Sequence, residues 1–76
     1  MKAFVLINIR TGEINDVVQQ LKKIKQVRDV NMTFGPYDAV AIVDSKDIND
    51  LGQILAGIIQ PIPGVEETLT CLAVET

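Results

Sequence analysis

The stretch VRDVNMTFGPYDAVAIVD, residues 27–44, decides the fold that the sequence predicts. Its two halves, residues 27–34 and 37–44, are rich in β-branched and apolar residues, which are typical of strands. Between them, Gly35-Pro36 is a sequence that favours a turn. The stretch therefore predicts two consecutive strands in the middle of the chain, joined by a short loop.

A strand and a helix are predicted before this stretch. Residues 3–10, AFVLINIR, form an apolar run that is typical of a buried strand. Thr11-Gly12 interrupts the run, and Thr11 is a residue that can cap a helix. Residues 13–25 then predict an amphipathic helix, because apolar residues recur at helical spacing at Ile14, Val17, Val18, Leu21 and Ile24.

A second helix and a last strand are predicted after the central stretch. Ser45 or Asp47 can cap this helix, and Pro61 and Pro63-Gly64 end it. Its apolar stripe consists of Ile48, Leu51, Ile54, Leu55, Ile58 and Ile59. Residues 65–75 predict the last strand.

The resulting order of elements, βαββαβ, is the ferredoxin-like pattern of the α+β class. Right-handed crossovers would place both helices on one face of a four-stranded antiparallel sheet. Because 76 residues suffice for only one hydrophobic core, we expect a single domain over residues 1–76.

The predicted strands are apolar on both faces, although two helices can cover only one face of the sheet. The first strand carries Ala3, Val5, Ile7 and Ile9 on one face, and Phe4 and Leu6 on the other. The third strand carries Val40 and Ile42 on one face, and Tyr37, Ala39, Ala41 and Val43 on the other. The last strand carries Leu69, Cys71 and Ala73 on one face, and Leu72 and Val74 on the other. An exposed apolar face of this size marks an interface, so we expect the sheets of two chains to pack together. The alternative is a monomer with an exposed apolar surface.

Charge and composition argue against several kinds of partner. The net charge is −3, with 7 basic and 10 acidic residues, and the basic cluster of Lys22, Lys23, Lys25 and Arg28 suits the C-terminal end of a helix. Because nucleic-acid affinity depends on clustered Lys and Arg, we do not expect the chain itself to bind DNA. No apolar run approaches the length of a membrane span, and from the residues before the first strand we expect no secretory signal. The single cysteine fits a cytoplasmic location.

Residues that could carry catalysis are scarce. The chain has no His, which excludes Ser-His-Asp triads and most zinc sites. Cys71 lies in mid-strand and is expected to act as a small core residue. Glu66 and Glu67 are neighbours on a strand, so they should point to opposite faces and not act as a carboxylate pair. Gly52 and Gly57 lie inside the second helix, where a close approach to the sheet or to a partner would be a reason for glycine. We therefore expect no enzymatic activity, no metal and no cofactor.

Three segments carry a resemblance to a known family. They are Gly35-Pro36-Tyr37-Asp38-Ala39-Val40, then Asp47, Leu51 and Ile54, and then Ile62-Pro63-Gly64-Val65-Glu66-Glu67-Thr68-Leu69-Thr70. With these segments, essentially the whole chain resembles the effector-binding domain of the Lrp/AsnC family of amino-acid-responsive transcription regulators. This domain is also called the regulation of amino-acid metabolism domain.

The resemblance implies a mode of assembly and a ligand. Domains of this family have the βαββαβ fold, form homodimers through their sheets as dimeric α+β barrels, and assemble into octamers or similar rings. Amino-acid effectors bind in clefts between the dimers. The sequence has no helix-turn-helix before its first strand, so it looks like a stand-alone effector domain and DNA binding is not implied. Regulation of a full-length Lrp/AsnC relative by mixed assembly is left open.

The same resemblance implies five ligand-binding residues. Carried over from the family, they are Gly35, Tyr37 and Asp38 in the loop between strands two and three, and Thr68 and Thr70 in the last strand. Asp38 can pair with the ammonium group of an amino acid, and N–H groups of the turn around Gly35 can take its carboxylate. Thr68 and Thr70 are two residues apart on a strand, so both hydroxyls should lie on one face. Each residue also has a purely structural interpretation, in the turn or in the strand.

Two other functions remain open. One is an enzyme of the dimeric α+β barrel type, which a polar cavity between the sheet and the helices of one chain would favour. The other is an assembly module without a ligand, which sealed clefts between dimers would favour.

Overall fold

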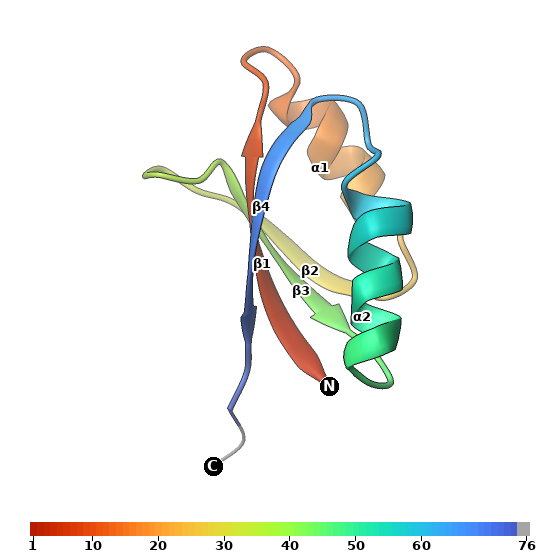
Figure 1. Cartoon of the computed structure of the whole chain (residues 1–76). Coiled ribbons are helices and arrows are strands. Elements are labelled where there is room, and N and C mark those ends of the chain that lie inside the picture. The colour runs from red at the N-terminus through yellow and green to blue at the C-terminus, as the bar shows by residue number, and fades with distance from the viewer. Residues whose placement is uncertain (75–76) are drawn as a thin grey trace.

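The computed structural model describes residues 1–74 and has the predicted βαββαβ order. The elements are β1 (Lys2–Ile9), α1 (Ile14–Lys22), β2 (Val27–Met32), β3 (Ala39–Asp44), α2 (Ile48–Ile54), a π-helical turn (Leu55–Ile59) and β4 (Val65–Leu72). The strands form one antiparallel sheet in the order β2-β3-β1-β4, and both helices lie on the same side of it (Figure 1). The predicted ferredoxin-like fold is confirmed.

The core lies between the sheet and the helices. Residues of β1 and β3 alternate between buried and half-buried, and the buried ones include Val5, Ile7 and Val43, which are fully inaccessible to solvent. Val17 and Leu21 of α1 are buried against this side of the sheet. The predicted apolar stripe of the first strand, Ala3, Val5, Ile7 and Ile9, is the face that the helices cover.

The first helix is shorter than the predicted range 13–25, and Thr11 does not cap it. The N-terminal cap position is occupied by Glu13, which makes no side-chain capping bond. The backbone N–H of Glu13 donates to the carbonyl of Arg10 at 3.0 Å, closing a turn in which Gly12 has a φ of +88°. Because this turn uses residues 10–13, helical geometry starts only at Ile14.

The second helix begins at Ile48 and is capped by Asp47, one of the two predicted caps, whose carboxylate accepts from the N–H of Asp50 at 2.8 Å. Its far end differs from the prediction, because a π-turn over Leu55–Ile59 follows the α-helix. The backbone N–H of Gln60 donates to the carbonyl of Leu55 at 2.8 Å, five residues earlier, so the turn holds one residue more than an α-turn.

The extra residue changes which side chains face the core. Ile59 is fully buried, whereas Ile58 is 41% exposed, and Ile48 in the first turn is 56% exposed. The predicted stripe is therefore wrong at Ile48 and Ile58. The space around Gly52 and Gly57 is open, so these glycines do not mark a close approach of the helix to the sheet.

The strands flanking the central loop are shorter than predicted, because residues 33–38 form a closed loop of their own. The N–H of Thr33 donates to the carbonyl of Asp38 at 3.0 Å, and its hydroxyl donates to the carbonyl of Tyr37 at 2.7 Å. The loop projects beyond the sheet, with Phe34 fully exposed (Figure 1). In the last strand, regular pairing ends at Leu72; Ala73 and Val74 lie outside it, and residue 75 of the predicted range lies outside the described residues.

The other face of the sheet, here called the open face, is apolar over three strands. In register, Phe4 of β1 lies between Ile42 of β3 and Cys71 of β4, and the next row consists of Val40, Leu6 and Leu69. Neither α1 nor α2 lies on this side of the sheet (Figure 1). The prediction that both faces of the sheet are apolar is therefore confirmed, and Cys71 is an exposed residue of the open face, not a core residue as predicted.

Within residues 1–74, no helix combines the length and the apolar character that crossing a lipid bilayer requires.

Candidate functional site

Asp38 is the residue just before β3 and lies beside the last residues of β1. Its N–H donates to the carbonyl of Ile7 at 2.9 Å, and its Oδ2 accepts from the N–H of Ile9 at 2.7 Å. Regular pairing of β3 begins only at Ala39, so the Asp38 carboxylate replaces the backbone carbonyl that a longer strand would offer to Ile9. One carboxylate oxygen of this half-buried residue thus already has a structural role.

Gly35 and Tyr37 belong to the same loop. Gly35 has a φ of +136°, a conformation that residues with a Cβ rarely adopt, and it is exposed. Tyr37 is half-buried. Beside the loop is a hollow of about 210 Å³ lined by Ile14, Met32, Thr33, Phe34 and Asp38. The structure therefore brings three of the five predicted ligand residues together, next to a small and largely apolar hollow.

Thr68 and Thr70 lie together on the edge strand β4. Thr68 is opposite Ile7 and Thr70 is opposite Val5, and both partners are buried on the helix side of the sheet. Both threonines are half-buried, and their side chains share this face. The Oγ1 atom of Thr68 accepts a hydrogen bond of 3.2 Å from Nε2 of Gln60, at the end of the π-turn.

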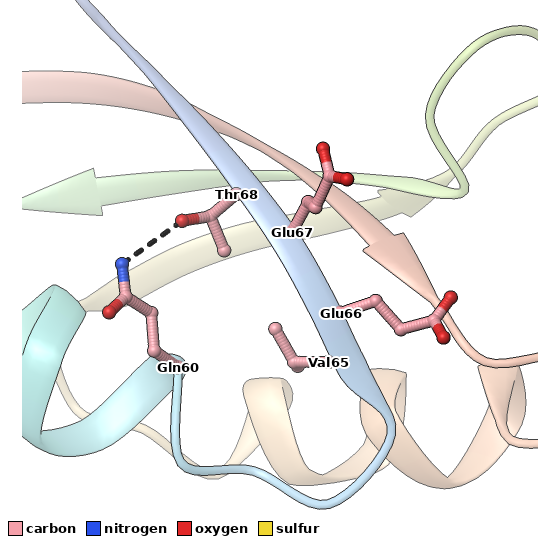
Figure 2. A pocket seen from close by; sticks show the side chains of 5 residues that line it. All are labelled: Gln60, Val65, Glu66, Glu67 and Thr68. Atoms are coloured by element: carbon pink, nitrogen blue, oxygen red, sulfur yellow. Dashed lines mark hydrogen bonds between the residues drawn. The ribbon is translucent and has the colours of Figure 1, made fainter.

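A second hollow, of about 350 Å³, lies beside Thr68. Gln60, Val65, Glu66, Glu67 and Thr68 line it (Figure 2). The sequence prediction missed Gln60, because the regular helical pattern gives no indication of the π-turn that directs it towards β4. The one feature of the sequence that could have indicated Gln60 as a site residue is its position between Ile59 and Pro61, and this indication is weak.

A β-bulge sets the direction of the two glutamates. The register shifts between Asn8 and Ile9, so that Glu67 is opposite Asn8, Val65 is opposite Ile9, and Glu66 has no partner. Val65 and Thr68 consequently face the helix side although they are three residues apart. The prediction that Glu66 and Glu67 point to opposite faces is wrong: both side chains are directed away from Gln60 (Figure 2).

The two groups of predicted ligand residues do not meet within one chain. Ala39, Ile7 and Thr68 lie in one row across β3, β1 and β4. Two strand spacings therefore separate Asp38 and Thr68, roughly 10 Å. The fully buried side chain of Ile7 lies between them on the helix side. A single chain thus provides two half-sites, called here the loop half-site (Gly35, Tyr37, Asp38) and the β4 half-site (Thr68, Thr70).

Comparison with known proteins identifies the family. The model of the Lrp/AsnC ligand binding domain matches residues 2–76. The chain belongs to the Lrp/AsnC ligand-binding domain family. Among its Lrp/AsnC relatives, the HTH-type transcriptional regulator FL11 of Pyrococcus abyssi is 36% identical over 76 residues, which are 100% of this chain and 50% of FL11. The chain thus spans about half the length of the curated relatives it matches, and these are transcriptional regulators.

Solved structures of other proteins share this fold. TTHA0845 from Thermus thermophilus superposes with a TM-score of 0.92 at 36% identity, over 99% of this chain and 94% of that one. The transcriptional regulator NMB0573 from Neisseria meningitidis, solved as a complex with L-Met, superposes with a TM-score of 0.89 over 97% of this chain and 49% of that one. At 16% identity, the second likeness shows the fold alone.

Proposed function

We propose that residues 1–76 form an amino-acid-binding, oligomeric regulatory domain of the cytoplasm that neither catalyses a reaction nor binds DNA itself. The observation that carries this proposal is the position of two polar half-sites beside β1, in a chain that a ligand-binding family model matches almost from end to end. The space between the sheet and the helices is filled by apolar side chains such as Val5, Ile7 and Leu21, which gives the enzyme hypothesis no support.

The ligand's head group is assigned to the loop half-site. Asp38 has one carboxylate oxygen beyond the one that Ile9 uses, and this oxygen is proposed to pair with the ammonium group. The N–H groups of the turn around Gly35 are proposed to take the carboxylate, with Tyr37 beside them. The complex of a same-fold regulator with L-Met supports an amino acid as the class of ligand.

The rest of the ligand is assigned to Thr68 and Thr70. Because the buried Ile7 separates the half-sites within one chain, the complete cleft is proposed to combine the loop half-site of one chain with the β4 half-site of another. Affinity should therefore depend on assembly.

Assembly is proposed to begin at the open face. Two copies that pack Phe4, Leu6, Val40, Ile42 and Leu69 against each other would bury an apolar surface that spans three strands and form a dimeric α+β barrel. Dimers would then join into an octamer or a similar ring, which brings the half-sites of different chains together.

A second candidate function is an assembly module without a ligand, which forms mixed oligomers with a DNA-binding Lrp/AsnC relative. The hydrogen bond from Ile9 to Asp38 favours it, because that bond alone is a sufficient reason for an aspartate at this position.

Calorimetry against the twenty common amino acids distinguishes the two functions. We expect at least one to bind, with an affinity in the micromolar to millimolar range that is usual for so small a ligand. Asp38→Asn keeps an oxygen for Ile9 but removes the charge, so it should weaken binding by roughly 10- to 100-fold, the worth of a charge-assisted hydrogen bond.

Asp16→Asn, at an exposed position of α1, removes the same charge away from the half-sites and should leave affinity unchanged. Binding of no amino acid below about 10 mM, or unchanged affinity in Asp38→Asn, would favour the assembly module.

A further inference from the structure

The π-turn determines where Gln60 lies. In a regular helix the position after Ile59 would be rotated away from its present direction, because each α-helical turn holds one residue fewer than the turn over Leu55–Ile59. With the wider turn, Ile59 fills the core and Gln60 lies over the first half of β4, just before Pro61 ends the helix. Turns of this kind are rare and occur frequently at functional sites.

The hydrogen bond between Gln60 and Thr68 has a direction. The amide Nε2 of Gln60 donates and the hydroxyl oxygen of Thr68 accepts, at 3.2 Å. A hydroxyl has one proton and two lone pairs, so an amide donor that occupies a lone pair leaves the proton free. Thr68 therefore presents a hydrogen-bond donor to the hollow of about 350 Å³ (Figure 2).

The charges around this hollow are all of one sign. Glu66 and Glu67 line it, and its other lining residues, Gln60, Val65 and Thr68, are uncharged. Both glutamate side chains are directed away from Gln60, but they are the charged members of this lining, so a carboxylate on the ligand would still be repelled by their negative charge and would find no Lys or Arg to pair with it. An uncharged oxygen could accept from Thr68 without this repulsion.

We propose that Gln60 is a positioning residue that fixes Thr68 as a hydrogen-bond donor, so that the hollow selects an uncharged side-chain oxygen of an amino-acid ligand and disfavours a side-chain carboxylate. This inference rests on the proposed function and adds to it the class of side chain that the β4 half-site accepts.

Calorimetry with glutamine, glutamate and leucine tests the proposal. Glutamine and glutamate have nearly the same shape, and leucine offers no side-chain oxygen. We expect the wild type to bind glutamine at least tenfold more tightly than glutamate. Gln60→Glu offers the Thr68 proton an acceptor and should lower the affinity for glutamine about tenfold, while leucine binding stays unchanged. Gln60→Met removes the amide without adding an acceptor and should have a smaller effect.

Two controls test whether the effect of Gln60→Glu comes from the added charge and whether it depends on Thr68. Gln53→Glu adds the same charge at an exposed position of α2 outside the hollow, and should change none of the three affinities. Thr68→Val removes the hydroxyl, so in that background Gln60→Glu should no longer change glutamine binding, as a double-mutant cycle would show.

The possible failures can be told apart. If the wild type prefers glutamate or leucine to glutamine, or if Gln60→Glu alters all three affinities by the same factor, the inference on Gln60 is wrong and the proposed function stands. If the wild type binds none of the twenty amino acids, both are wrong.

Discussion

β1 is apolar on both sides, but its two faces differ in what covers them. Val5 and Ile7 are fully buried beneath the helices, whereas Phe4 and Leu6 on the open face are half-buried among neighbouring strand residues alone. The same contrast holds in β3 between Ala41 and Ile42. Apolar character therefore does not distinguish the two faces, because the position of the helices decides which face is the core. The uncovered face shows that this fold has a second surface suited to burial, and three predictions test the contrast.

The largest effect is expected from a charge in the middle of the open face. Ile42→Asp should convert a dimer into a folded monomer at micromolar concentration, because an unpaired buried charge costs several kcal/mol, or more than about 100-fold in Kd. Light scattering measures the mass, and circular dichroism measures the fold. Asn49→Asp adds the same charge in the exposed first turn of α2 and should leave the dimer intact.

A second variant keeps this prediction testable if Ile42→Asp does not fold. Leu69 is already 49% exposed in the single chain, so Leu69→Asp should disturb the monomer least. The thiol of Cys71 on the same face gives an independent measurement, since its labelling should be slow in the dimer and fast in either monomeric variant. A folded wild-type monomer with fast labelling would contradict the proposed interface.

A smaller effect is expected from a matched pair of truncations on the two sides of β1. Within a monomeric background, Ile7→Ala should lower the free energy of unfolding by about 2–5 kcal/mol, since it leaves a cavity in the core. Leu6→Ala, one residue away on the open face, should cost clearly less, because its side chain is only half-buried there. Urea denaturation measures both values. Equal losses would mean that the open face is packed within one chain.

The smallest effect is expected at the rim of the open face. Arg28 and Asp44 form an ion pair of 3.2 Å, with side chains that are 64% and 47% exposed. Arg28→Gln should change the free energy of unfolding of the monomer by less than about 1 kcal/mol, as is usual for exposed pairs. A larger loss in the dimer than in the monomer, measured by urea denaturation of both, would indicate that assembly covers this rim. A loss above about 1 kcal/mol in the monomer would show that the pair is more strongly coupled than its exposure indicates.

The candidate site was less predictable than the fold. The sequence placed Thr68 in the last strand, as observed, but its pattern put Asp38 inside a strand over residues 37–44, whereas Asp38 lies in the loop before β3. It also could not show that Asp38 holds the N–H of Ile9 or that Ile7 separates the half-sites. Gln60 was missed, because its role depends on a π-turn that a regular 3.6-residue period does not reveal.

The sequence by itself determined the order of the elements and the apolar character of both sheet faces, and it shows that none of the 76 residues is a His. Periodicity, turn residues and composition are local properties, and each strand's alternation can be read without its neighbours. Only the tertiary structure decided which face of the sheet the helices cover and which partner each polar group has. It also decided the direction of Glu66 and Glu67, which at the bulge both point away from Gln60. These depend on strand register and helix geometry, where one additional residue moves every side chain that follows it.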